Sequence, residues 1–227
     1  MIMRFTYLGH ASFKVESDRK TVFIDPWLNG PTSPIKTDDV NKADIVLVTH
    51  DHGDHGYAEA IEICKKTDAT FIAINELGIQ AKNDGVKKAH TLNIGGSVEV
   101  DGINLTLVQA FHSCGIGAPT GFIVEFPSGT IYHSGDTGVF YDMKLFAEIY
   151  GPIDVAMLPI GSYYVMSERQ ALKAAELIKP KFVIPMHYDT FPVIKANPKR
   201  FWQEVATHVR GTTVQVMTPG ESWEMKK

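Results

Sequence analysis

The sequence lacks several features that mark particular classes of protein. Among its 227 residues are two cysteines, Cys64 and Cys114, whose spacing forms neither a disulfide framework nor a CxxC metal site. No apolar run approaches the roughly 20 residues that span a bilayer. The first residues, MIMRFTYLGHASF, do not have the charged, apolar and small-residue regions of a signal peptide. These absences predict a cytoplasmic protein in a reducing compartment, without a membrane partner.

Clustered positive charge is also scarce. The formal net charge is -4, and Asn197 and Pro198 interrupt the densest cationic stretch, from Lys195 to Arg200. A nucleic-acid binder that uses a broad basic surface is therefore not expected. Apolar residues make up 44% of the chain, which is ordinary for a protein with a sizeable core. The length is consistent with a single domain that covers residues 1–227.

Short apolar and β-branched segments predict a chain rich in strands. A helical pattern follows the apolar segment of residues 44–50, because Ala58, Ile61 and Cys64 recur at helical spacing. The pair Asp101-Gly102 and the PSG of residues 127–129 each separate two apolar segments, which predicts two hairpins. The strand segments before residue 140 are residues 3–9, 12–17, 21–28, 44–50, 70–74, 98–100, 103–108, 122–126 and 130–136.

The second half repeats the first. The strand led by Asp44, with its helix and following strand, is echoed 110 residues later by a unit led by Asp154. A capping box from Ser167 to Gln170 begins the second helix, and Pro180 follows its end. Two β-rich halves with helices, about 1–118 and 119–227, predict an α/β (α+β) protein in which two mixed sheets pack face to face with helices outside.

The stretch VTHDHGDHG, residues 48–56, follows an expected buried strand and contains His50, His52, Asp54 and His55. As isolated buried groups these side chains would carry a severe desolvation cost. Imidazole and carboxylate groups suit zinc, and also iron or manganese. A polar surface loop that happens to be rich in histidine is the alternative, but the position directly after a buried strand favours a metal site.

Four residues cannot serve two metals, so further ligands should lie at the ends of other strands. His112 follows NLTLVQAF, Asp136 follows TIYHSG, and His187 follows KFVIPM. All three come at the carboxyl end of an apolar strand, as the cluster does. They complete the pattern HxHxDH, His, Asp, His.

These residues resemble the metallo-β-lactamase superfamily, whose signature is THxHxDH with further His, Asp and His ligands downstream. The resemblance covers nearly the whole chain and includes the two-fold repeat of the four-layer αββα sandwich. Five further motifs are similar to a compact group of metal-dependent hydrolases related to ascorbate-6-phosphate lactonase and N-acyl-phosphatidylethanolamine phospholipase D. These motifs are LGHASF at 8–13, FIDPWL at 23–28, AFHS at 110–113, HSGDTG at 133–138 and PMHYDTFP at 185–192.

The resemblance implies two divalent metal ions, with zinc expected first and manganese or iron as alternatives. His50, His52 and His112 would bind one ion, Asp136 would bridge, and the other ion would be bound by Asp54, His55 and His187. A hydroxide shared by two such ions would attack a small ester, lactone or phosphodiester. Asp54 could also accept a proton from the attacking water, or serve as a ligand alone. The expected partner is a small-molecule substrate, and a homo-oligomer is left open.

Other residues near these strand ends are candidates for supporting roles. Asp25 is expected to hold the second ring nitrogen of a ligating histidine, with a turn carboxylate before Pro26 as the alternative. His10 could act on the substrate or its leaving group, or be an ordinary histidine with satisfied hydrogen bonds. The expected pocket residues are Trp27, Tyr163, Tyr164 and Tyr188.

Three other functions share this ligand pattern. Iron-dependent redox enzymes of the persulfide dioxygenase type retain HxHxDH, so the identity of the bound metal separates them from hydrolases. Nucleases of this superfamily have the same metal site but add an exosite arm or a large inserted domain. A metal-binding sensor without catalysis would keep the ligands and show no turnover.

Overall fold

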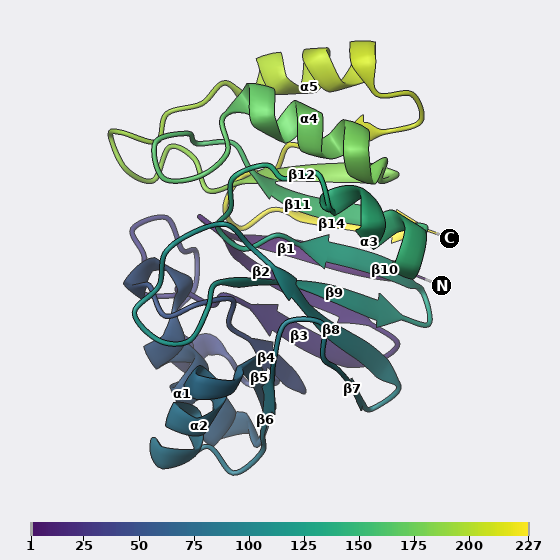
Figure 1. Ribbon diagram of the computed structural model, residues 1–227. Coiled ribbons are helices and arrows are strands. Elements are labelled where there is room, and N and C mark those ends of the chain that lie inside the picture. Colours follow the sequence, from purple (N-terminus) through teal and green to yellow (C-terminus); the bar gives the residue numbers. More distant parts are fainter. Residues whose placement is uncertain (1, 227) are drawn as a thin grey trace.

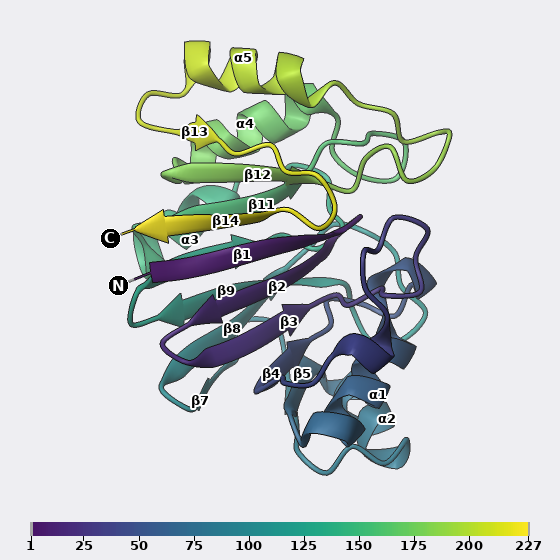
Figure 2. The ribbon, with the colours of Figure 1, turned by 180° about the vertical axis from the view of Figure 1, so that it is seen from behind.

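The computed structural model describes residues 2–226, and in that part of the chain two seven-stranded sheets face each other with helices outside (Figures 1 and 2). The first sheet runs in the order β14 (Ser222–Lys226), β1 (Ile2–Gly9), β2 (Ser12–Ser17), β3 (Lys20–Ile24), β4 (Ile45–Leu47), β5 (Thr70–Ile74) and β6 (Ala89–Leu92). The second runs in the order β13 (Thr213–Val214), β12 (Phe182–Met186), β11 (Val155–Pro159), β10 (Gly129–His133), β9 (Thr120–Phe126), β8 (Ile103–Gln109) and β7 (Ser97–Val100). Both sheets mix parallel and antiparallel pairs, so the predicted fold class is confirmed.

Helices cover the outer face of each sheet. α1 (Tyr57–Thr67) and α2 (Asn75–Asn83) pack on the first sheet, while α3 (Met143–Tyr150), α4 (Glu168–Ile178) and α5 (Pro198–His208) pack on the second. Two short 3-10 helices, η1 (Thr37–Asp39) and η2 (Gly53–His55), lie in loops. None of the helices in residues 2–226 is long and apolar enough to cross a bilayer.

Alternation along the strands divides the apolar residues between two cores. In β9, Phe122 and Val124 face the core between the sheets, whereas Ile123 faces the helices of the second sheet. In β10 the same division places Ile131 between the sheets and Tyr132 under the helices. All five side chains are fully buried. The second sheet is therefore apolar on both faces, which fixes its register between the first sheet and its own helices.

The repeat read from the sequence is present in the fold. β4, α1 and β5 form one parallel unit, and β11, α4 and β12 form the other. Ser167 caps α4 as predicted, since its hydroxyl accepts from the Gln170 backbone N–H at 3.4 Å and its own N–H donates to the Gln170 side chain at 2.9 Å. The two predicted hairpins are β7–β8 and β9–β10, which are antiparallel pairs.

The two sheets do not coincide with the two halves, about 1–118 and 119–227, that the repeat suggested. β7 and β8 precede residue 118 yet belong to the second sheet, and β14 returns to the first sheet beside β1. The chain changes sheets once after β6 and again after β13. The C-terminal strand thus closes the first sheet by antiparallel pairing, in which Phe5 lies opposite Trp223.

Strand direction brings distant residues to one edge. β1, β3 and β4 run the same way in the first sheet, and β8, β10, β11 and β12 run the same way in the second. Their carboxyl ends meet at the edge that carries the long loops, whereas the two ends of the described chain, Ile2 and Lys226, lie at the opposite edge (Figures 1 and 2). Every residue that was expected to bind metal follows one of these strands.

Candidate metal centre

The first cluster consists of His50, His52 and His112, whose ligand atoms all lie within 4.8 Å of one another. His50 Nε2 is 3.0 Å from His52 Nδ1. The Thr49 hydroxyl uses its proton to donate to Asp25 Oδ2 at 2.7 Å. The same hydroxyl lies 3.0 Å from His50 Nδ1, so it accepts a hydrogen bond from the N–H at that position. This tautomer leaves the lone pair of His50 Nε2 directed at the other histidines.

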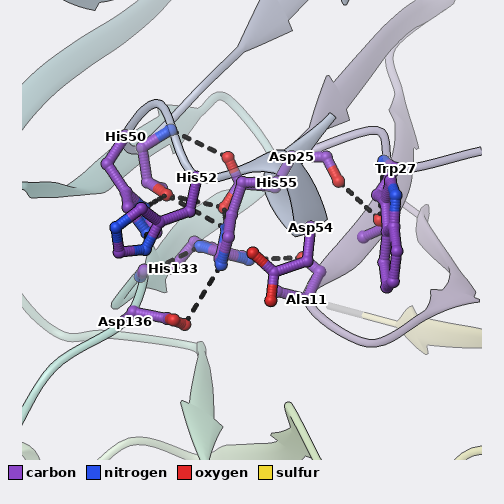
Figure 3. A network of polar contacts seen from close by, with 12 residues as sticks. Ala11, Asp25, Trp27, His50, His52, Asp54, His55, His133 and Asp136 are labelled. Carbon is purple, nitrogen blue, oxygen red and sulfur yellow. Dashed lines mark hydrogen bonds and ion pairs between the residues drawn. The ribbon is translucent and has the colours of Figure 1, made fainter. Parts of the chain in front are cut away.

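The second cluster consists of His10, Asp54, His55 and His187, again within 4.8 Å. His55 Nδ1 donates to Asp25 Oδ2 at 2.7 Å, and the Thr49 N–H donates to Asp25 Oδ1 at 2.8 Å (Figure 3). The carboxylate of Asp25 is completely buried and holds the His55 ring in one orientation. The contact expected between Asp25 and a ligating histidine is present, and it leaves His55 Nε2 facing the cluster.

Asp136 lies between the two clusters. Its Oδ2 is 3.5 Å from His112 Nε2 and 3.1 Å from His187 Nε2, while its Oδ1 is 3.3 Å from His55 Nε2. Figure 3 shows His55 between the carboxylates of Asp25 and Asp136. One carboxylate thus faces histidines of both clusters, which is the place that the resemblance gave to a bridging ligand.

Several polar atoms of this centre have no hydrogen-bond partner among residues 2–226, although they are buried. They are His55 Nε2, Asp136 Oδ1, and both ring nitrogens of His187. A buried polar atom left without a partner costs about 1–3 kcal/mol. Divalent cations would satisfy such atoms, and a set of imidazole and carboxylate donors suits zinc, manganese or iron. The residues present therefore fit a metal centre.

Electrostatics keeps most of these side chains in the protonation states that metals require. Burial lowers the pKa of His50 to about 2 and also lowers the pKa of His112, so both rings are neutral. Burial would raise the pKa of Asp54, but the hydrogen bond from His10 and the charge of His55 hold it below its usual value. His55 is the exception, because Asp136 and Asp25 raise its pKa well above the ordinary value against the effect of burial.

His10 is buried beside Asp54. Its Nε2 donates to Asp54 Oδ2 at 3.1 Å, and its Nδ1 accepts from the Thr190 hydroxyl at 2.9 Å. Both ring nitrogens are therefore engaged, and His10 has no lone pair free for a metal. Its ring also packs on His187, with centroids 3.9 Å apart. His10 thus fixes the orientation of two of the expected ligands.

Backbone strain is concentrated at this centre. His10, Asp25 and His187 have φ values of 54°, 46° and 54°, in the left-handed region that non-glycine residues rarely adopt. Each follows the end of a strand and turns its side chain into the site. Such strain costs about 1–3 kcal/mol per residue and persists where the surrounding structure enforces it, typically at functional sites.

A cavity of about 510 Å³ opens in front of the ligands. Sequence reasoning placed Tyr164 here but missed Ser113, Phe191 and Val193. The apolar residues that closely follow His187 in PMHYDTFPV are the signal that could have located the last two. The lining residues are His52, Asp54, His112, Ser113, Asp136, Tyr164, His187, Phe191 and Val193.

Three of the other expected pocket residues lie outside this cavity. Tyr163 is 73% exposed and contacts the ring of Tyr164 from outside, because the left-handed turn at Ser162 and Tyr163 directs it away. The Trp27 ring packs edge-on against the His10 ring, with the ring centroids 5.3 Å apart. Tyr188 lines a smaller cavity of about 200 Å³ on the other side of His10. Of the four aromatic residues expected in the pocket, Tyr164 therefore lines this cavity and Tyr163, Trp27 and Tyr188 do not.

His133 and Cys114 lie near the centre without facing it. His133 Nε2 donates to the Ala11 carbonyl at 2.9 Å, and its Nδ1 accepts from the Gly135 N–H at 3.2 Å (Figure 3). Both ring nitrogens of His133 are therefore engaged within the protein, which gives this residue a structural role. Cys114 is half-buried and contacts the Gly117 carbonyl oxygen at 3.4 Å, so it does not contribute to the cavity.

Known proteins share both the sequence and the fold. The β-lactamase superfamily domain matches residues 4–187. A UPF0173 metal-dependent hydrolase of Methanopyrus kandleri is 46% identical over 231 residues, covering 98% of this chain and 100% of the relative. A UPF0173 metal-dependent hydrolase of Caldivirga maquilingensis is 46% identical over 220 residues, covering 95% of each. Igni18, a metallo hydrolase from the hyperthermophilic archaeon Ignicoccus hospitalis, superposes with a TM-score of 0.93 at 39% identity, covering 100% of both chains.

Two facing sheets with a histidine and carboxylate cluster at their shared edge, together with these relatives, place the chain among the metal-dependent hydrolases of the metallo-β-lactamase class. The expected resemblance to that superfamily is confirmed. Within it, this chain belongs to the UPF0173 family of metal-dependent hydrolases.

Proposed function

We propose that the protein hydrolyses a small ester, lactone or phosphodiester with the help of two divalent cations, zinc foremost. His50, His52 and His112 would hold one cation, Asp54, His55 and His187 the other, and Asp136 would bind both. The position of Asp136 carries this proposal, since its two oxygens lie 3.1–3.5 Å from histidines of both clusters. A carboxylate in that position without cations would leave buried atoms unpaired.

Cations bound by these residues would lower the pKa of water to about 7 and would polarise the substrate oxygen. The remaining work falls to the chain itself. Asp54 faces the cavity with its side chain 24% exposed, and the hydrogen bond from His10 keeps it ionised. It is therefore placed to accept a proton from the attacking water as well as to bind a cation. His10 positions this carboxylate, and the buried rings around it exclude bulk water.

A small molecule is the substrate that this site favours. The cavity volume of about 510 Å³ lies within the usual range for small-molecule sites. The formal charge of -4 and the absence of a clustered basic stretch argue against a nucleic-acid substrate. Hydrolysis of a small molecule therefore takes precedence over the nuclease alternative.

The experiment begins with metal analysis of protein expressed without metal supplementation. The stripped protein is then reconstituted separately with zinc, manganese and iron, and each form is assayed against p-nitrophenyl esters, lactones and bis(p-nitrophenyl) phosphate. We expect two equivalents of metal per chain and turnover that depends on metal without consuming oxygen. Turnover only with iron and oxygen would assign the redox function instead. Metal binding without any turnover would favour the sensor.

Two variants connect the activity to the centre. Asp54→Ala should lower turnover about 10²–10⁴-fold if this carboxylate moves a proton. His90→Ala is the matched control, because His90 is an exposed histidine in β6 outside the centre and should leave metal content and turnover unchanged. Equal activity of both variants would contradict the proposed assignment of Asp54.

A further inference from the structure

The cavity has two chemically different sides. On one side are the expected metal ligands, and on the other lie Tyr164, Phe191 and Val193. We call these three side chains the apolar wall. Tyr164 belongs to the loop between β11 and α4, whereas Phe191 and Val193 belong to the loop between β12 and α5. Two separate loops thus place apolar groups beside the position where a bond would be hydrolysed.

The apolar wall is a fixed part of the fold. The loop that carries Phe191 and Val193 is closed by two backbone hydrogen bonds, from Ile194 to Phe191 at 3.2 Å and from Asp189 to Ile194 at 2.8 Å. Ile194 itself is fully buried and anchors this loop. The Phe191 ring packs against the rings of His10 and Trp27, with ring centroids 5.5 Å and 6.0 Å away, so it is held beside the candidate metal centre.

Part of this wall is open to solvent. Val193 is 49% exposed and Tyr164 is 54% exposed, at the mouth of a cavity rather than on a convex surface. When an apolar ligand covers exposed apolar surface at the rim of a cavity, the burial of that surface stabilises the complex. A substrate that fills only the space over the metal ligands would leave that surface in water.

The charges around the cavity favour an uncharged group at this wall. Among residues 2–226, the cavity is lined by no lysine or arginine, and the carboxylates that line it are Asp54 and Asp136. An anionic group away from the metals would lose water and gain no counter-charge, which is unfavourable. Specific binding of a substrate with a second negative charge is therefore disfavoured.

We propose that the apolar wall binds an uncharged acyl chain of the substrate, adjacent to the bond that is cleaved. This inference rests on the proposed hydrolysis and specifies its substrate class. Tyr164, Phe191 and Val193 then determine specificity, while the expected metal ligands carry out the reaction. An extended acyl group gains from each methylene that it buries against the wall.

The test compares p-nitrophenyl acetate, propanoate and pentanoate with the p-nitrophenyl monoester of glutarate, whose acyl chain matches pentanoate but ends in a carboxylate. We expect kcat/KM to rise about fourfold for each methylene that is buried. The glutarate monoester should be at least tenfold poorer than pentanoate. Metal-dependent turnover at equal kcat/KM for all four esters would overturn the inference while leaving the proposed hydrolysis intact.

Substitutions at Val193 locate the effect, because this apolar side chain is half-exposed and has no group that could bind a metal ion. Val193→Ser should raise KM for pentanoate several-fold more than it raises KM for acetate. Val193→Lys should shift the preference about tenfold toward the glutarate monoester. Ile79→Ser is the matched control, since Ile79 is 47% exposed on α2 and does not line the cavity. Equal effects of Val193→Ser and Ile79→Ser would overturn the inference.

A binding experiment separates this inference from the proposed hydrolysis. Acetohydroxamate, pentanohydroxamate and the hydroxamate of glutarate are titrated into zinc-loaded protein by calorimetry. Tighter binding of pentanohydroxamate supports the apolar wall even if no ester is turned over. The absence of ester turnover would contradict only the proposed hydrolysis. Equal affinities for the three hydroxamates would overturn the wall whatever the turnover.

Discussion

Replacing Asp25 with asparagine tests how the centre is held from behind. The buried Asp25 carboxylate accepts three hydrogen bonds, from the Thr49 N–H, the Thr49 hydroxyl and His55 Nδ1, at 2.7–2.8 Å. Asparagine has nearly the same shape and tolerates the left-handed backbone at this position, where φ is 46°. Its amide can accept on only one side, so its NH₂ group must face a donor on the other.

The consequence for the metal follows from the tautomer of His55. When the amide NH₂ faces Nδ1, that nitrogen has to accept, and the ring proton moves to Nε2. His55 Nε2 is the atom that faces Asp136 at 3.3 Å, where the lone pair is needed. Loss of such a supporting contact typically weakens metal binding about 10–100-fold. That factor corresponds to about 1.4–2.7 kcal/mol.

The assay is competition with a chromophoric chelator, which resolves the affinities of the two metals. Asp25→Asn should lower the affinity for the ion assigned to Asp54, His55 and His187. Asp18→Asn is the control, because Asp18 is an exposed aspartate with φ of 49° that lies far from the centre in a turn between β2 and β3. If both variants bind both metals as the unaltered protein does, the argument that Asp25 supports His55 is refuted.

Three further predictions concern metals and protons. Chelation should lower the thermal midpoint, since free zinc at about 1,000 times its Kd stabilises the folded chain by about 4 kcal/mol; an unchanged midpoint would show that no ion was bound. Because the pKa of His55 is raised, filling its cluster at pH 7 should release about one proton, and calorimetry in buffers of different ionisation enthalpy will count it. From His50 alone, metal-free protein should lose about 1.4 kcal/mol of stability per pH unit as the pH falls below about 6.5, and His10, whose pKa is lowered to about 4, adds to this loss. The reason is that His50 binds a proton in the unfolded chain in this pH range, but stays neutral in the folded chain, where its pKa is lowered to about 2. A urea midpoint that does not change from pH 7 to pH 5 would contradict this prediction.

The candidate metal centre was predictable because each of the expected ligands follows an apolar strand. His112, Asp136 and His187 are distant in sequence, but the parallel direction of β8, β10 and β12 brings their ends together. Which residues share an ion did not follow from spacing, and that assignment came from the resemblance. The position of Asp136 between the clusters agrees with it and was visible only in three dimensions.

Loop residues were harder to predict. Phe191 and Val193 lie in a segment without regular periodicity, so nothing local indicates which side chains face the cavity. The neighbouring residues Tyr163 and Tyr164 diverge because a left-handed turn separates their directions. Likewise, the sequence repeat did not reveal that β14 crosses back to the first sheet, since strand partners depend on contacts far along the chain.

The arrangement of β1 has a practical consequence. This strand begins at Ile2, paired with Lys226, and ends at Gly9 beside His10. Seven steps of about 3.3 Å place both ends of the described chain about 23 Å from the cavity. A purification tag, a fluorescent label or attachment to a solid support at either end would therefore leave the entrance clear for incoming molecules.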